Sequence, residues 1–157
     1  MSARDFELQV YAEDGVFYEG PCFELILPCV DGEKAFLAYH EDVVYAVYNG
    51  IMRMRIPVER AEGADVAAAI ADKNIPLSVL QEAVIGTGVA HFSNNRCVVL
   101  AETVERPDEI DENRARRALE RAQEKMQREL SMREYRISQM AMARATARIR
   151  ALSRKEK

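Results

Sequence analysis

A chain of 157 residues, of which 48% are hydrophobic and 31% charged, is long enough for one domain or for a small domain with an appendage. It contains no tryptophan and few other aromatic residues, which argues against a surface that stacks nucleic-acid bases. Residues 1–15 lack the basic start and apolar run of a signal peptide, and no window is apolar for long enough to span a bilayer. We therefore expect a cytoplasmic protein without direct membrane insertion.

The net charge of −4 conceals a gradient along the chain. Residues 1–108 hold 18 acidic against 8 basic side chains, whereas residues 133–157 hold 8 basic against 2 acidic ones. A basic tail behind an acidic body favours an anionic partner. Nucleic acid and an acidic protein surface are both candidates, and the tail could also fold back onto its own acidic domain.

The side chains that usually carry catalysis or bind metals form no recognisable pattern. Cys22, Cys29 and Cys97 are odd in number and widely spaced, so they fit neither a disulfide framework nor a zinc site. We expect free, buried thiols in a reducing compartment. No nucleophile accompanies a partner base, so we predict no catalytic residue and no metal site.

The first two thirds of the chain have the pattern of β-strands. Phe6, Leu8 and Val10 alternate with polar residues, as in a strand with one buried face. Further short β-rich runs, separated by turn residues, continue to about Val104. This spacing predicts an antiparallel β-sandwich or barrel over residues 1–105.

Two turns and one insertion are predicted within this region. Asn49-Gly50 lies between two β-rich runs and predicts a hairpin, because this dipeptide accepts positive φ at both turn positions. A second reversal is expected at Asn94-Asn95. The alanine-rich stretch Ala64–Ala71 predicts two turns of helix, within an insertion at residues 59–76.

After Pro107 the pattern becomes helical. Asp108 is the predicted N-cap of a first helix, and Ser131 with Glu134 predicts an S-x-x-E capping box that starts a second helix. The apolar stripe of the first helix is Ala115, Ala118, Leu119, Ala122 and Met126, and that of the second is Ile137, Ala141, Ala145, Ile149 and Leu152. The expected fold class is α+β: an N-terminal antiparallel β-sandwich followed by an antiparallel two-helix hairpin over residues 106–157.

In these features the chain resembles the epsilon subunit of bacterial F-type ATP synthases. The stretch "FELQVYAEDGVFYEG" is similar to the opening strands of that family, and "GEKAFLAYH" is similar to its Gly-Glu…His loop. The stretch "IGTGVAHFSNNRCVVLAETVE" resembles its Ser-Gly-Gly strand, hairpin turn and final strand. A helical arm follows in the expected place.

The most specific match is "IDENRA", which resembles the I/L-D-x-x-R-A pattern of epsilon subunits that bind ATP. The family also has an acid before this pattern and three arginines after it, and this chain has matching residues at those places. The resemblance therefore implies an ATP site made of Glu105, Ile110, Asp111, Arg114, Ala115, Arg121, Arg144 and Arg148.

The chemistry of these residues is compatible with a nucleotide. Arg114 and Arg121 lie two helical turns apart, and Arg144 and Arg148 lie one turn apart. In a folded hairpin the four guanidinium groups can converge on phosphate oxygens. There is no Gly-rich phosphate loop with a Walker lysine, so we do not expect tight triphosphate binding of the hydrolytic kind. The resemblance implies ATP as a regulatory ligand and no cofactor. The alternative is a solvated helix face on which Asp111 only caps the helix.

The resemblance also implies partners and a mechanism. Gly32, Glu33 and His40 match a loop that contacts the membrane-embedded rotor ring, although this chain lacks the Gly-Pro-Gly-rich spacing usual before the histidine. The other implied partners are the gamma subunit and the catalytic alpha and beta subunits, at the cytoplasmic face of the bacterial plasma membrane. The protein would be a non-catalytic subunit that couples proton translocation to ATP synthesis and inhibits ATP hydrolysis through a mobile arm. The rival hypothesis is a standalone interaction module whose basic arm binds nucleic acid or an acidic protein.

Overall fold

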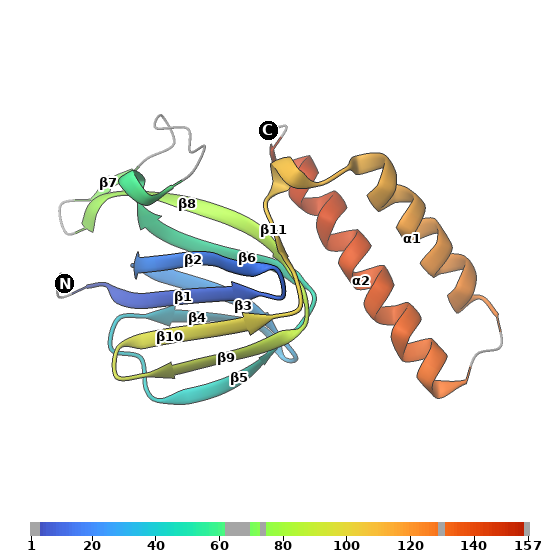
Figure 1. Cartoon of the computed structure of the whole chain (residues 1–157), viewed down its shortest axis with the longest axis horizontal. Coiled ribbons are helices and arrows are strands. Elements are labelled where there is room, and N and C mark those ends of the chain that lie inside the picture. Colours follow the sequence, from blue (N-terminus) through green and yellow to red (C-terminus); the bar gives the residue numbers. More distant parts are fainter. Residues whose placement is uncertain (1–3, 62–69, 73–74, 129–130, 156–157) are drawn as a thin grey trace.

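The structure is a computed structural model that describes residues 4–61, 70–72, 75–128 and 131–155. The strands are β1 (Phe6–Ala12), β2 (Gly15–Cys22), β3 (Glu24–Cys29), β4 (Gly32–Leu37), β5 (Val43–Val47), β6 (Gly50–Pro57), β7 (Ile70–Asp72), β8 (Ile75–Ile85), β9 (Gly88–Ser93), β10 (Arg96–Ala101) and β11 (Val104–Glu105). The 3-10 turns η1 (Val58–Arg60) and η3 (Pro107–Glu109) and the helices α1 (Glu112–Met126) and α2 (Met132–Lys155) complete it. Figure 1 shows the helical hairpin beside one end of the β domain, with α2 between α1 and the strands.

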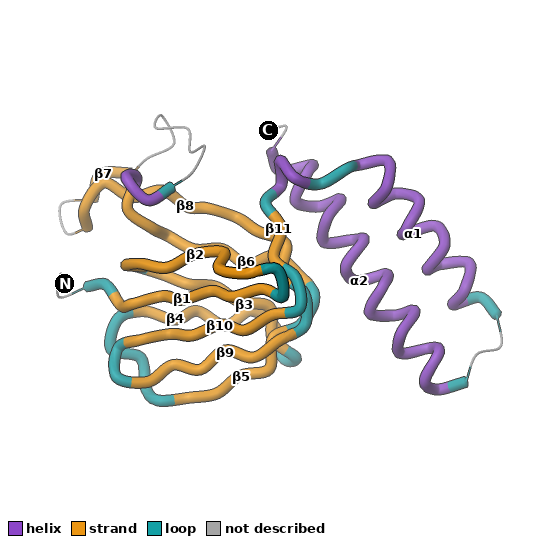
Figure 2. Tube along the Cα trace, in the orientation of Figure 1, coloured by secondary structure: helices purple, strands orange, loops and turns teal. Residues whose placement is uncertain are grey.

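The predicted α+β fold is confirmed. The strands form one hydrogen-bonded path in the order β11-β8-β6-β3-β5-β9-β10-β1-β2, with β4 paired to β3 and β7 paired to β8. This path folds around a single core (Figure 2), because alternate side chains of nearly every strand point inward. Its largest fully buried side chains are Phe6, Phe36, Phe92, Leu8, Leu25 and Leu27. One pairing departs from the antiparallel prediction, since β1 runs parallel to β10.

The hairpin predicted at Asn49-Gly50 is wrong. The strands on either side of this dipeptide do not pair with each other: β5 pairs with β9, while β6 pairs with β3 and β8. Neither residue has positive φ. Gly50 serves a different purpose, because a Cβ atom there would lie 2.8 Å from Cβ of Pro28. The glycine permits close packing on β3 rather than a tight turn.

The reversal predicted at Asn94-Asn95 is confirmed. The two asparagines join β9 to β10 with φ values of 52° and 57°, as a two-residue hairpin turn of this hand requires. Of the helix predicted over Ala64–Ala71, the described residues Ile70 and Ala71 lie in β7 instead, since pairing with β8 overrides the helix preference of alanine. The remainder of that prediction lies outside the described residues.

The thiols are free and buried, as predicted. Burial raises the pKa of the Cys22 thiol, and it raises the pKa of Cys97 to about 12. Within the part of the chain that the structure describes, no group of side chains could hold a metal ion. No described helix is both long and apolar enough to cross a membrane.

The start of the first helix differs from the prediction. Asp111, not Asp108, is the N-cap of α1, and its Oδ1 accepts from the backbone N–H of Arg114 at 2.9 Å. Asp108 lies in η3, where the Glu109 carboxylate accepts from the backbone N–H of Arg106 at 2.9 Å. The extended backbone of Ile110 separates the two helical segments.

The second helix begins as predicted, but its buried face differs. The Ser131 hydroxyl donates to the Glu134 carboxylate at 2.7 Å and accepts from the Glu134 backbone N–H at 3.3 Å, which is the predicted capping box. The predicted stripe is wrong at Ile137, which is 56% exposed, whereas Ala147 and Ala151 are buried outside that stripe. The reason is that α2 packs against two neighbours, α1 and the β domain, on different faces.

Candidate functional site

The arm docks on the β domain through a small apolar contact. Ala147 and Ala151 of α2 pack against Val84 of β8, and all three are buried. Ile51 and Ile110 cover the edge of this group, which we call the dock. Alanine side chains let the helix approach the strands closely, but they bury little apolar surface. The dock is therefore a weak contact by hydrophobic burial alone.

Two ion pairs flank the dock. The Arg148 guanidinium donates to both Glu105 carboxylate oxygens at 2.6 Å, in the bidentate geometry that makes such pairs strong. Their side chains are 27% and 32% exposed. Farther along α2, Arg154 Nη1 donates to Glu82 Oε1 at 2.8 Å. Arginines of the basic tail thus meet carboxylates of the acidic domain, which was one of the alternatives that the charge gradient left open.

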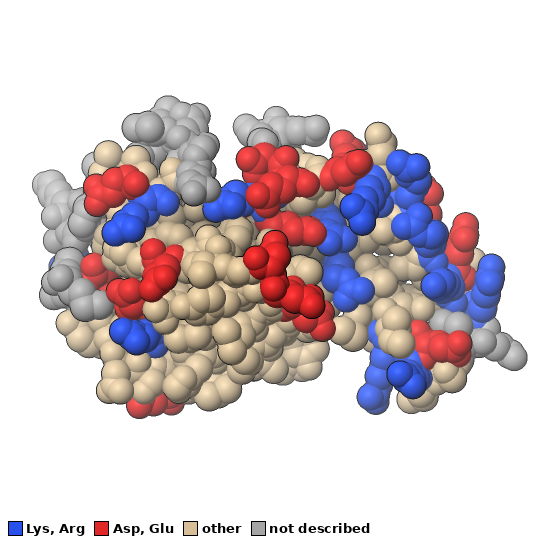
Figure 3. All heavy atoms as spheres, in the orientation of Figure 1, with Lys and Arg blue, Asp and Glu red and all other residues tan. Residues whose placement is uncertain are grey.

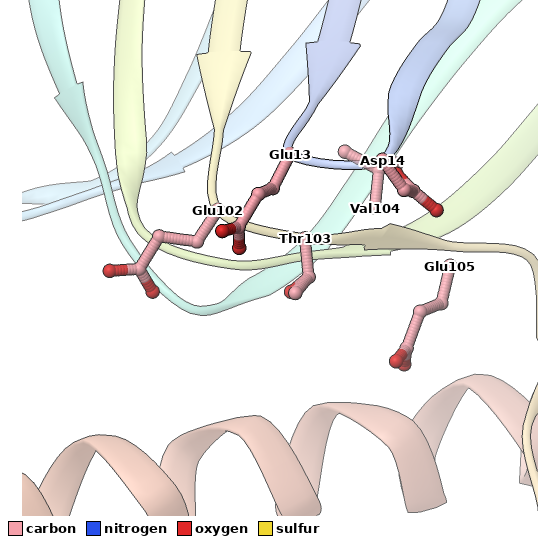
Figure 4. Close-up of a pocket in the computed structure, with 6 residues that line it drawn as sticks. All are labelled: Glu13, Asp14, Glu102, Thr103, Val104 and Glu105. Carbon is pink, nitrogen blue, oxygen red and sulfur yellow. The ribbon is translucent and has the colours of Figure 1, made fainter.

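The end of the β domain that faces the arm is acidic. A cleft there is lined by Glu13, Asp14, Glu102, Thr103, Val104 and Glu105, and Figure 4 shows the Glu105 carboxylate pointing toward α2. A neighbouring cleft shares some of these residues and adds Arg144 and Arg148 from α2. Figure 3 shows the carboxylates gathered on the β domain opposite the basic arm. This second cleft therefore carries both signs of charge, with the carboxylates of Glu13 and Glu102 on the β domain and the two arginines on α2.

The predicted ATP-binding residues are only partly brought together. Glu105, Arg144 and Arg148 meet at the clefts between α2 and the β domain. Arg114 and Arg121 are exposed on α1, and the cleft that Arg144 and Arg148 line takes no residue from α1.

The three remaining residues of the predicted ATP site have structural contacts. Ile110 packs at the dock, Asp111 caps α1, and Ala115 is buried. The arrangement places Asp111 at a helix N-terminus, where a carboxylate satisfies free N–H groups. ATP binding therefore remains a prediction for this group.

The residues matched to a ring-contacting loop lie at opposite ends of β4. Gly32 opens this strand with φ of 114°, and the adjacent Glu33 accepts from Arg53 Nη2. His40 lies beyond the other end, where its ring packs against Phe36 and Phe92 with centroid distances of 5.1 and 5.4 Å. A single contact that includes both ends would have to extend along the whole strand.

Sequence reasoning missed the Glu82–Arg154 pair. The two residues are 72 positions apart, and each resembles an ordinary charged residue on an exposed strand or helix face. The only sequence signal for such a contact was the opposite net charge of the two halves of the chain.

Comparisons with known proteins agree with this architecture. Residues 108–153 match the family model described as "ATP synthase, Delta/Epsilon chain, long alpha-helix domain". The ATP synthase epsilon chain of Ruminiclostridium cellulolyticum is 36% identical, over 96% of this chain and 97% of that protein. That of Caldicellulosiruptor saccharolyticus is 32% identical, over 93% of this chain and 92% of that protein.

The fold also has solved counterparts. A chain in the cryo-EM structure of the Euglena gracilis mitochondrial ATP synthase superimposes with a TM-score of 0.68 at 19% identity, covering 98% of this chain and 82% of that chain. This likeness concerns the fold. From the full-length similarity to its bacterial relatives, the chain belongs to the family of ATP synthase epsilon chains.

Proposed function

We propose that this chain is a non-catalytic subunit of the ATP synthase central stalk, at the cytoplasmic face of the bacterial plasma membrane. Its β domain would contact the gamma subunit and the rotor ring and would help to couple proton translocation to rotation. Its arm would regulate ATP hydrolysis by the catalytic alpha and beta subunits. Membership of the epsilon chain family supports this proposal.

The observation that carries the regulatory part is the small size of the dock. Its buried side chains are two alanines and one valine, and the ion pairs beside it are partly exposed to solvent. The Glu82–Arg154 pair, whose arginine is 52% exposed, should contribute only about 0.2–1 kcal/mol, and the bidentate Glu105–Arg148 pair somewhat more. A contact of this kind suits an element that leaves and returns. Once released, the basic α2 would be free to reach acidic surfaces of the catalytic subunits.

The proposed nucleotide role follows from the cleft that Arg144 and Arg148 line. Two guanidinium groups beside an open cleft suit the oxygens of a phosphate chain. Phosphate binding would engage Arg148, which now pairs with Glu105. ATP would favour the folded arm only if it binds that state more tightly, because a ligand shifts an equilibrium by its differential affinity.

Calorimetric titration of the full-length chain with ATP tests the nucleotide site. The Arg144→Ala, Arg148→Ala variant should lose saturable binding. The matched control is Arg116→Ala, Arg117→Ala, because these arginines lie on the exposed face of α1 and should bind as the unmodified chain does. Absence of binding in the unmodified chain would contradict the nucleotide site and leave the family assignment intact.

Deletion of residues 109–157 tests the inhibitory arm. An ATP synthase assembled with the shortened chain should hydrolyse ATP faster than one with the full chain. Unchanged hydrolysis would contradict an inhibitory role of the arm.

A further inference from the structure

A row of alternating charges crosses the β domain and ends in the arm. Glu33 in β4 accepts from Arg53 in β6, and Arg53 lies directly opposite Glu82 of β8 in the strand register. Glu82 in turn accepts from Arg154, in the last turn of α2. The side chains of Arg53 and Glu82 lie on the same face of the sheet, because cross-strand partners share a face.

This row gives Glu82 properties that suit a docking residue. Its side chain is only 22% exposed, so solvent screens it less than a surface carboxylate. Arg53 faces Glu82 across the two strands, so a cation stays close to this carboxylate when the arm is absent. Glu82 can therefore lose Arg154 while a cation remains opposite it on the neighbouring strand.

We propose that Glu82 and Arg154 form a latch that holds the arm on the β domain without any nucleotide. The latch is distinct from the residues proposed to bind ATP, because neither partner lines the cleft that Arg144 and Arg148 share. Arg154 lies six residues beyond Arg148, about 9 Å along α2. The proposal rests on the proposed function in one respect, since it requires that the arm can undock.

The consequence is a folded arm with two independent supports. Phosphate competes with Glu105 for Arg148, but it leaves Arg154 on Glu82. Binding of an anion at the arginine cleft would then not release the arm, because the second pair and the dock remain. The latch is electrostatic, so rising salt concentration should weaken it.

The test measures the ratio of docked to undocked arms in the full-length chain without nucleotide, by energy transfer between fluorophores. Fluorophores on cysteines introduced at the exposed positions Val16 and Gln139 report the distance between the β domain and α2. The native thiols are buried and should not be labelled. Glu82→Gln should lower the ratio by roughly 1.4- to fivefold, and Arg154→Glu by more, from the usual range for partly exposed pairs. Combining Arg154→Glu with Glu82→Gln should recover part of the Arg154→Glu loss, because the repulsion between two carboxylates is then removed.

The matched control is Arg136→Glu, which is exposed on the same helix and does not line the cleft between α2 and the β domain that Arg154 lines. It should leave the ratio within the error of the unmodified chain. The latch is overturned if Glu82→Gln recovers nothing of the Arg154→Glu loss, or if Arg136→Glu lowers the ratio as much as Arg154→Glu. If ATP changes the docked-to-undocked ratio but none of these variants does, the latch alone is contradicted. An arm that stays docked in every variant and condition contradicts the mobile arm of the proposed function.

Discussion

Replacing Ala151 by leucine should undock the arm. Ala151 is 1% exposed and packs at the dock against Val84, which is 4% exposed. A leucine adds three heavy atoms where there is no space for them, and overpacking of this kind costs about 1–3 kcal/mol. Since about 1.4 kcal/mol corresponds to a factor of ten, the docked-to-undocked ratio should fall roughly 5- to 140-fold.

Hydrogen exchange of the backbone amides of α2 measures this change in the isolated protein. Undocking should increase exchange in the segment around Ala151 while the β domain keeps its protection. Gln139→Leu adds a leucine at an exposed position of the same helix and is the matched control. If Ala151→Leu exchanges as slowly as the control, the dock is not what holds the arm, and the reasoning from its packing is refuted. In an assembled ATP synthase, the undocked arm should also inhibit hydrolysis more strongly.

Three other changes test the fold itself. Gly88→Ala should destabilise the β domain by about 3 kcal/mol in urea unfolding, because the alanine Cβ would lie 2.1 Å from the carbonyl oxygen of Leu100. Unchanged stability of this variant would contradict the close packing at Gly88. Hydrogen bonds from Ser131 hold the pKa of Glu134 below its usual range. These bonds should therefore stabilise α2 fully at a pH above the pKa of Glu134 in the unfolded chain. The stabilisation should be lost as the pH falls through the lower pKa of Glu134 in the folded chain. The helicity of Ser131→Ala, followed by circular dichroism, should show a smaller pH dependence, because only the backbone N–H of residue 131 still donates to Glu134; an unchanged dependence would contradict this. Native Cys97, whose pKa burial raises to about 12, should resist a thiol reagent at pH 8 and react only after unfolding; rapid native labelling would show that it is accessible.

Local features were predictable from the sequence because they depend on residues a few positions apart. The alternation of Phe6, Leu8 and Val10 identified a strand with one buried face, and all three are fully buried. The Ser131–Glu134 capping box follows from a spacing of three residues. The β-then-helix order, and with it the α+β class, follows from the change of hydrophobic period after Pro107.

The tertiary structure decided what depends on neighbours far apart in the chain. Asn49-Gly50 had the composition of a hairpin turn, but β3 lies between the strands it connects, and Gly50 serves close packing on Pro28. The family resemblance placed Glu105 and Arg148 in one site, but neither their direct pairing nor that of Glu82 with Arg154 could be predicted, since the partners lie 43 and 72 residues apart. By itself the sequence determined a basic helical tail behind an acidic β domain. Which carboxylate each arginine meets depends on how the hairpin packs against the sheet, and that is a property of the folded whole.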